Sequence, residues 1–255
     1  EIYTLSLHDA LPIYENGFDL KKDQGKEILP IRPVIICGDD ITFICHAKLA
    51  LYLAERFLQT WNERSNSDSG LKPFGLPVNG EFSACAGIAI AKTKYPFYRT
   101  YQFAEQCCAL AKKSARREEK GSWIDFQIII GTKSGSLEKI REDEGKVRSI
   151  KQYFGPYCIE EDNEKSMAGL KSGIREFKRG EYWAENKQKE LRTAYNLGKE
   201  AVDMFITGMK AQGGSLPAIT QLREKPQYKE QGYADQQTPY PDILEMMDFY
   251  PLFLL

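Results

Sequence analysis

The sequence predicts an α+β fold in which helices cover one face of a sheet. Short apolar runs rich in β-branched residues recur between positions 34 and 130, and two amphipathic helical segments alternate with them. Of the 255 residues, 42% are apolar and 12% aromatic, enough to bury the core of one large domain or two modest ones.

The first two strands are expected on either side of a Gly-Asp turn. Residues 34–37 (Val-Ile-Ile-Cys) and 41–45 (Ile-Thr-Phe-Ile-Cys) are β-formers, and Gly38-Asp39-Asp40 separates them. Two such runs around a Gly-Asp turn predict a β-hairpin. Gly38 allows the positive φ of a tight turn.

Helical and strand-like segments alternate after this hairpin. Residues 47–61 and 98–117 place apolar side chains at helical spacing, so each predicts an amphipathic helix. Residues 82–91 are small and almost wholly apolar, as in a central strand, and Gly87 there permits close approach of another backbone. Residues 122–130 predict a further strand.

The rest of the chain divides into a linker and a helical region. Residues 131–155 are polar and are expected to form a linker. Helical patches at 165–178 and 183–210 predict a helical domain over residues 156–255. The strand-rich segment before the linker defines an α+β domain over residues 14–130.

The first thirteen residues are expected to lie outside the fold. Residues 1–13 resemble the translation of a common sequencing adapter, and the chain does not begin with Met. Without Glu1 and Asp9 the 36 acidic residues become 34, against 35 basic residues. We therefore expect the natural protein to extend upstream and the domain over 14–130 to be truncated.

Composition argues against a membrane-spanning or disulfide-stabilised protein. No apolar run in the sequence approaches the roughly 18 residues needed to cross a bilayer. The six cysteines include no Cys-x-x-Cys pair, and five of them fall in strand-like runs or on a helical stretch: Cys37, Cys45, Cys85, Cys107 and Cys108. This pattern favours buried free thiols in a reducing cytoplasm.

Asp39 and Asp40 are the candidate catalytic residues. Two adjacent carboxylates in a tight turn repel each other, and a divalent cation relieves that repulsion. Mg²⁺ prefers one or two carboxylates plus substrate phosphate oxygens, and two such ions about 4 Å apart can activate a hydroxyl and stabilise a leaving pyrophosphate. The alternative is a solvent-exposed turn, since Asp and Gly are common turn residues.

Residues 36–45 (Ile-Cys-Gly-Asp-Asp-Ile-Thr-Phe-Ile-Cys) resemble the Gly-Gly-Asp-Asp hairpin in the palm domain of the large subunit of type III CRISPR effector complexes. The resemblance covers about residues 30–130 and continues through the elements that follow the hairpin in this family, at residues 83–92, 95–99, 104–113 and 122–126. It implies a ferredoxin-like palm domain, truncated at its N-terminus, with a C-terminal helical region similar to that of related stand-alone proteins.

By this resemblance, Asp39 and Asp40 hold Mg²⁺ or Mn²⁺ and carry out catalysis. Two departures from the family pattern bear on that role. Cys37 replaces the first glycine of the motif; at positive φ it would strain the turn by about 1 kcal/mol or more, and at ordinary φ it is tolerated. The strand that supplies another metal-binding aspartate in the family has no recognisable counterpart over residues 14–29.

The resemblance also implies contacts to the nucleotide. Gly38 and Ser83 line the nucleotide site, and Lys112 or Lys113 binds the triphosphate. For the two lysines the alternative is a solvated helix end, and for Ser83 it is a hydrogen bond to backbone.

These observations lead to two functional hypotheses. The first is a palm-type nucleotidyltransferase that acts on ATP or another nucleoside triphosphate and makes a cyclic oligonucleotide in CRISPR-type antiviral defence. The second is a non-catalytic nucleotide-binding or assembly module with a degenerate palm. CRISPR effector subunits or RNA are candidate partners, although the net charge of −1 gives no support for a broad RNA surface beyond local basic patches.

Overall fold

The computed structural model describes residues 2–7, 13–14, 17–18, 22–23, 26–27, 30–67, 82–131, 135–180, 182–251 and 254–255. The chain is a mixed α+β protein, as predicted, and it divides into two compact units. The first unit comprises Glu1–Lys133, Pro156–Glu160 and Phe249–Leu254, and the second comprises Ser134–Gly155, Glu161–Asp248 and Leu255.

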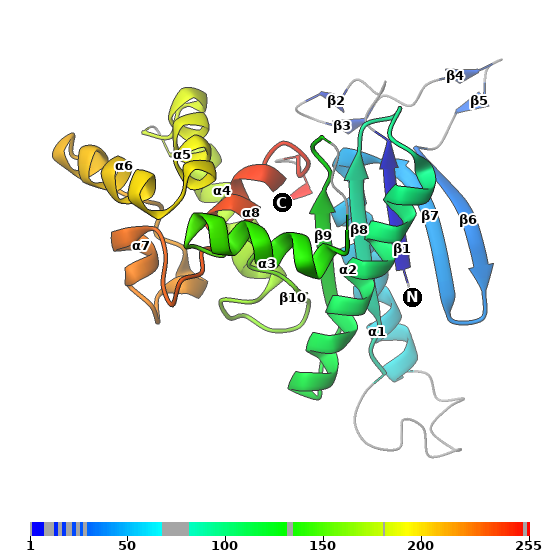
Figure 1. Cartoon of the computed structure of the whole chain (residues 1–255). Helices are drawn as coiled ribbons and strands as arrows, with labels where there is room; N and C mark the ends of the chain where they lie inside the picture. The colour runs from blue at the N-terminus through cyan, green and yellow to red at the C-terminus, as the bar shows by residue number, and fades with distance from the viewer. Residues whose placement is uncertain are drawn as a thin grey trace. The chain divides into compact units, whose positions relative to one another are not determined.

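A six-stranded sheet forms the centre of the first unit (Figure 1). Its strands are β1 (Ile2–Leu7), β6 (Ile31–Cys37), β7 (Asp40–His46), β8 (Cys85–Ala91), β9 (Trp123–Ile128) and β10 (Tyr157–Cys158). The strand order is β10-β9-β8-β1-β7-β6; the four inner strands are parallel, and the two edge strands are antiparallel to their neighbours. Two small hairpins lie outside this sheet: β2 (Ile13–Tyr14) with β3 (Gly17–Phe18), and β4 (Lys22–Asp23) with β5 (Lys26–Glu27).

Two long helices cover opposite faces of the sheet, α1 (Ala47–Ser67) behind it and α2 (Phe97–Glu118) in front of it in Figure 1. Every residue of β8 and β9 is buried, because both faces of these strands are covered. The prediction that the helices share one face is therefore wrong. An almost wholly apolar strand is typical of a parallel sheet buried on both sides, because each crossover helix covers a face.

The central strand and its glycine were predicted correctly. The predicted strand over residues 82–91 contains β8, and Gly87 lies against α2, where a Cβ would stand 2.0 Å from the Ala104 carbonyl oxygen. The helix expected to end at residue 61 continues to Ser67, so the expected loop over 62–80 begins later; residues 68–81 lie outside the described part.

The prediction that residues 1–13 lie outside the fold is wrong for Ile2–Leu7. This segment forms β1, which lies between β7 and β8 and pairs with both. Its composition of Ile, Tyr, Thr, Leu and Ser suits a strand, and the crossover through α1 leaves room for one strand between β7 and β8.

The direction of β1 differs from that of the first strand in a ferredoxin-like palm. In such a βαββαβ unit the crossover helix makes the first two strands parallel, and the third strand lies between them antiparallel to both. Here β1 is parallel to β7, with Ile2 opposite Ile41 and Leu7 opposite His46, and therefore antiparallel to β6. The ferredoxin-like arrangement is not confirmed.

The second unit is helical. Its helices are α3 (Leu137–Arg148), α4 (Met167–Arg179), α5 (Glu185–Leu197), α6 (Lys199–Ala211), the 3₁₀ helix η2 (Thr220–Leu222), α7 (Gln227–Gln231) and α8 (Tyr240–Met246). Its core includes the fully buried side chains of Phe177, Tyr195 and Tyr240. In the described part of the chain no helix is long and apolar enough to cross a membrane.

The expected linker over residues 131–155 contains α3, so the linker prediction is wrong for that stretch. The Ser136 hydroxyl accepts a hydrogen bond from the Lys139 amide at 3.4 Å and caps the helix. Leu137 is fully buried, and the Arg148 guanidinium donates to the Asn196 carbonyl at 3.2 Å. The other α3 side chains whose burial the structure describes are partly or fully exposed, which is compatible with a polar sequence.

Candidate functional site

The hairpin of β6 and β7 turns through Gly38 and Asp39, as predicted. Cys37 pairs with Asp40, which leaves these two residues as the turn. Gly38 has a φ of 61°, whereas Cys37 and Asp39 are not among the described residues with positive φ. Positive φ at the first turn residue alone is the pattern of a type II′ turn, so the family's glycine is not required at Cys37.

Cys37 is nevertheless not a buried thiol. It lies at the end of the edge strand β6 and is exposed, whereas the other five cysteines are buried and none of the six forms a disulfide. The prediction of buried thiols is therefore wrong for Cys37. An apolar run predicts a strand, but it does not show whether that strand lies at the edge of the sheet, where its side chains meet solvent.

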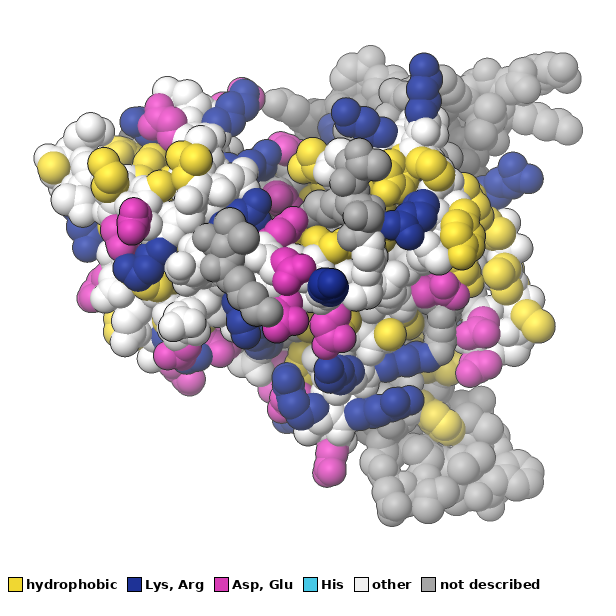
Figure 2. Space-filling model, in the orientation of Figure 1, with side chains coloured by type: hydrophobic (Ala, Val, Ile, Leu, Met, Phe, Trp, Pro, Cys, Tyr) yellow, Lys and Arg dark blue, Asp and Glu magenta, His cyan; other side chains and the backbone are white. Residues whose placement is uncertain are grey.

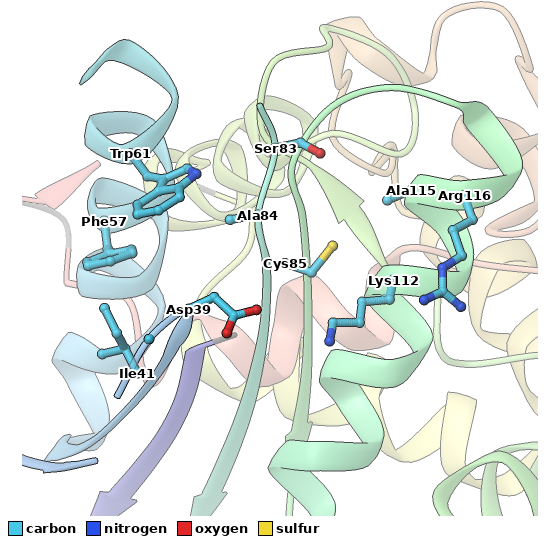
Figure 3. A pocket seen from close by; sticks show the side chains of 11 residues that line it. Asp39, Ile41, Phe57, Trp61, Ser83, Ala84, Cys85, Lys112, Ala115 and Arg116 are labelled. Carbon is cyan, nitrogen blue, oxygen red and sulfur yellow. The ribbon is translucent and has the colours of Figure 1, made fainter. Parts of the chain in front are cut away.

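A cavity of about 290 Å³ lies between the hairpin turn, α1, the start of β8 and the C-terminal half of α2 (Figure 3). Its lining residues come from all four segments: Gly38, Asp39, Ile41, Phe57, Trp61, Ser83, Ala84, Cys85, Lys112, Ala115 and Arg116. The volume is near the lower end of the range for small-molecule sites.

Four of the six predicted site residues line this cavity: Gly38, Asp39, Ser83 and Lys112. In Figure 3 the Asp39 carboxylate and the Lys112 ammonium point into it from opposite sides. Asp40 and Lys113 are not among its lining residues, and both are exposed. Of the two adjacent lysines that the sequence left as alternatives, Lys112 lines the cavity and Lys113 does not.

Positive charge gathers on the α2 side of the cavity. Lys112 and Arg116 are one helical turn apart, and like charges at this spacing destabilise a helix slightly. Burial, and secondly the nearby Arg116, lower the pKa of Lys112. The helix dipole favours Arg116 in the last turn but does not reach Lys112. An anion in the cavity would offset the repulsion between the two cations.

On the face drawn in Figure 2, the described Lys and Arg side chains do not form a broad cationic surface. Figure 2 shows Lys and Arg side chains gathered over the lower end of α2 with acidic side chains among them. Arg117 pairs with Glu118 at 3.0 Å. This mixed surface gives no support for a wide polyanion-binding face, in line with the net charge.

Two aromatic side chains form the α1 side of the cavity. The rings of Phe57 and Trp61 stack with centroids 6.5 Å apart and an interplanar angle of 15°. Trp61 is 39% exposed, whereas Leu58, between them in sequence, is fully buried. Helical spacing alone placed both aromatics on the core face. Trp61 is the last residue of the apolar stripe, and a polar run follows it directly. This position is the sequence signal that could have shown that its side chain lies outside the core.

A hydrogen-bond network holds this wall against the sheet. The Ser122 hydroxyl accepts the Ala84 amide at 3.0 Å and donates to the Asn62 side chain at 2.9 Å. Asn62 also donates to Glu160, which accepts the Ser122 amide at 2.8 Å. Because Asn62 follows Trp61 and Ala84 lines the cavity, the network fixes the end of α1 relative to the start of β8.

The donor set suits a metal ion only together with a ligand. Among the described residues no cluster of three or more His, Cys, Asp or Glu side chains could hold a metal ion. Asp39 is the one carboxylate among the lining residues, with Asp40 beside it in sequence. Mg²⁺ commonly binds through one or two carboxylates and completes its shell with water and phosphate oxygens. The residues thus fit an ion that is bound jointly with a phosphate group.

No protein-family model matches the chain, and no curated protein matches it significantly. The assignment of a function therefore depends on the chemistry of the cavity and on the hairpin motif.

Proposed function

We propose that the cavity binds a nucleoside triphosphate, ATP in the first instance, together with a divalent cation, and that the protein is a palm-type nucleotidyltransferase. The single observation that carries the proposal is that Asp39 and Lys112 line one cavity. The hairpin resemblance implies Asp39 as a metal ligand and one of the adjacent lysines, Lys112 or Lys113, as a triphosphate ligand.

Different lining residues of the cavity would bind the phosphates in different ways. Lys112 and Arg116 supply positive charge for phosphate oxygens, and a guanidinium can donate two parallel hydrogen bonds. Gly38 carries no side chain, and a Cβ there would meet no atom of the described residues within 4 Å, so a ligand can approach the turn backbone. Positioning and electrostatic stabilisation of this kind account for most of the catalysis in phosphoryl transfer.

Asp39, with Asp40 beside it, would hold Mg²⁺ or Mn²⁺ jointly with the phosphates. When bound, the ion supplies neutralisation of phosphate charge and lowers the pKa of a coordinated hydroxyl. Asp39 is exposed at the turn, where an ion that arrives with the nucleotide can reach it.

One observation favours a second candidate, a nucleotide-binding module without catalysis. The segment Ile2–Leu7, which lies next to β7, contains no Asp or Glu, so it brings no further carboxylate to the hairpin. With one ion at most, binding could persist without transfer. Release of pyrophosphate from ATP separates the two candidates, because only the enzyme produces it.

The biological setting follows from the resemblance alone. We place the protein in the cytoplasm, in CRISPR-type antiviral defence, with synthesis of a cyclic oligonucleotide as the reaction and effector subunits or RNA as candidate partners. The proposal concerns the whole natural protein.

The adjacent lysines provide a matched test of the site. We expect Lys112→Met to weaken ATP binding by roughly ten-fold or more, because it removes a charged partner of the phosphates. Lys113→Met makes the same chemical change one residue away and should leave the affinity unchanged. Equal losses in the two variants, measured by calorimetric titration, would show that ATP does not use this cavity.

A further inference from the structure

The aromatic wall on α1 is not needed to anchor that helix. Leu51, Ala54 and Leu58 are fully buried and already form its core-facing stripe. Trp61 lies beyond this stripe with over a third of its surface exposed, and Phe57 is half-buried beside it. Because Trp61 lines the cavity, its exposed apolar surface is available to a ligand there.

The geometry points to a planar ligand. The two rings are nearly parallel, and both line the cavity opposite Lys112 and Arg116 (Figure 3). The network through Asn62 and Ser122 ties the part of α1 next to Trp61 to the sheet, and the indole stacks on Phe57. A stacking surface of this kind binds any nucleobase, because every base presents a π-face.

We propose that Trp61, supported by Phe57, is the stacking surface for the base of the nucleotide, whose phosphates lie toward Lys112 and Arg116. This inference rests on the proposed function, since it assigns the base end of the ligand whose phosphate end defines that function. A cavity with cations on one wall and aromatic rings on the other matches a base joined to phosphates better than it matches a phosphate alone. A ligand with a base and phosphates and a ligand with phosphates alone can be tested separately.

The experiment compares ATP with inorganic tripolyphosphate, which has the phosphates and no base, both with Mg²⁺. Wild type, Trp61→Leu and Trp61→Phe are titrated, with Tyr98→Leu as the control because Tyr98 is a 67% exposed aromatic residue outside the cavity lining. We expect Trp61→Leu to weaken ATP binding by roughly 5- to 150-fold and to leave tripolyphosphate binding within about two-fold. Trp61→Phe should retain most of the affinity for ATP, and Tyr98→Leu should change neither ligand.

Tryptophan fluorescence provides a second readout. ATP should quench emission in the wild type, the quench should be lost in Trp61→Leu, and tripolyphosphate should cause none. If wild type binds tripolyphosphate as tightly as ATP, or if Trp61→Leu weakens both ligands alike, the base assignment is overturned while phosphate binding stands. If wild type binds neither ligand, the proposed function itself fails.

Discussion

Gly87 of β8 lies against the backbone of Cys108 in α2, so that a Cβ on Gly87 would stand 2.3 Å from the Cys108 nitrogen. Lys112 follows Cys108 by one helical turn on the same helix. The glycine therefore sets how closely α2 approaches the sheet, and with it the position of the cation that faces the hairpin.

Gly87→Ala should destabilise the protein and displace Lys112. Real Cβ atoms do not come this close to backbone, so the helix must move, and overpacking of this kind costs about 1–3 kcal/mol or more in the free energy of unfolding. Chemical denaturation measures the loss, and ATP affinity should fall with it. Gly208→Ala in α6 is the control, since its Cβ meets nothing within 4 Å; it should be neutral or stabilise by up to about 1 kcal/mol.

The turn should depend on glycine at position 38 and not at position 37. Gly38→Ala places an L side chain at a φ of 61° and should lower the free energy of unfolding by about 1–2 kcal/mol. Cys37→Gly introduces the first glycine of the motif that the hairpin resembles, but Cys37 has no positive φ to relieve, so the change should bring no gain and cost about 0.5–1 kcal/mol as a glycine in a strand. Stabilisation by Cys37→Gly in thermal melts would contradict the turn geometry.

Binding of ATP should weaken with rising pH earlier than an ordinary lysine predicts. Burial and Arg116 lower the pKa of Lys112 from its ordinary value of 10.5, so the side chain loses its charge at a lower pH. Affinity is therefore full below the lowered pKa and falls as the pH rises through it. Calorimetric titrations of ATP at increasing pH measure this fall in affinity. Lys112→Arg should make the affinity independent of pH over this range, because guanidinium does not titrate there. If the affinity of the wild type for ATP stays unchanged up to pH 10.5, this prediction is contradicted.

Local patterns predicted the elements that depend on neighbouring residues. The Gly-Asp turn, the apolar run around Gly87 and the helix that carries Lys112 are each encoded over a few residues, and the structure contains all three. Only the resemblance brought Asp39 and one of the lysines Lys112 and Lys113 into one predicted site, because nothing in the local pattern indicates that a turn and a distant helix meet.

Long-range pairing explains what the sequence could not predict. The place of Ile2–Leu7 between β7 and β8, and its parallel direction, depend on two strands far along the chain. Helical spacing likewise shows that Trp61 shares a face with Leu58, but not that the sheet covers one and leaves the other exposed. Among the α3 side chains whose burial the structure describes, only Leu137 is buried, which gave too little periodicity for a helix prediction among charged residues.

The most direct test of the account is calorimetric titration of ATP into the wild type, Asp39→Asn and Asp40→Asn, each with and without Mg²⁺. We predict that binding to the wild type requires Mg²⁺, that Asp39→Asn abolishes the requirement and most of the affinity, and that Asp40→Asn has a smaller effect because Asp40 does not line the cavity. Binding that is indifferent to both Mg²⁺ and Asp39 would contradict the claim that this hairpin holds a metal-bound nucleotide.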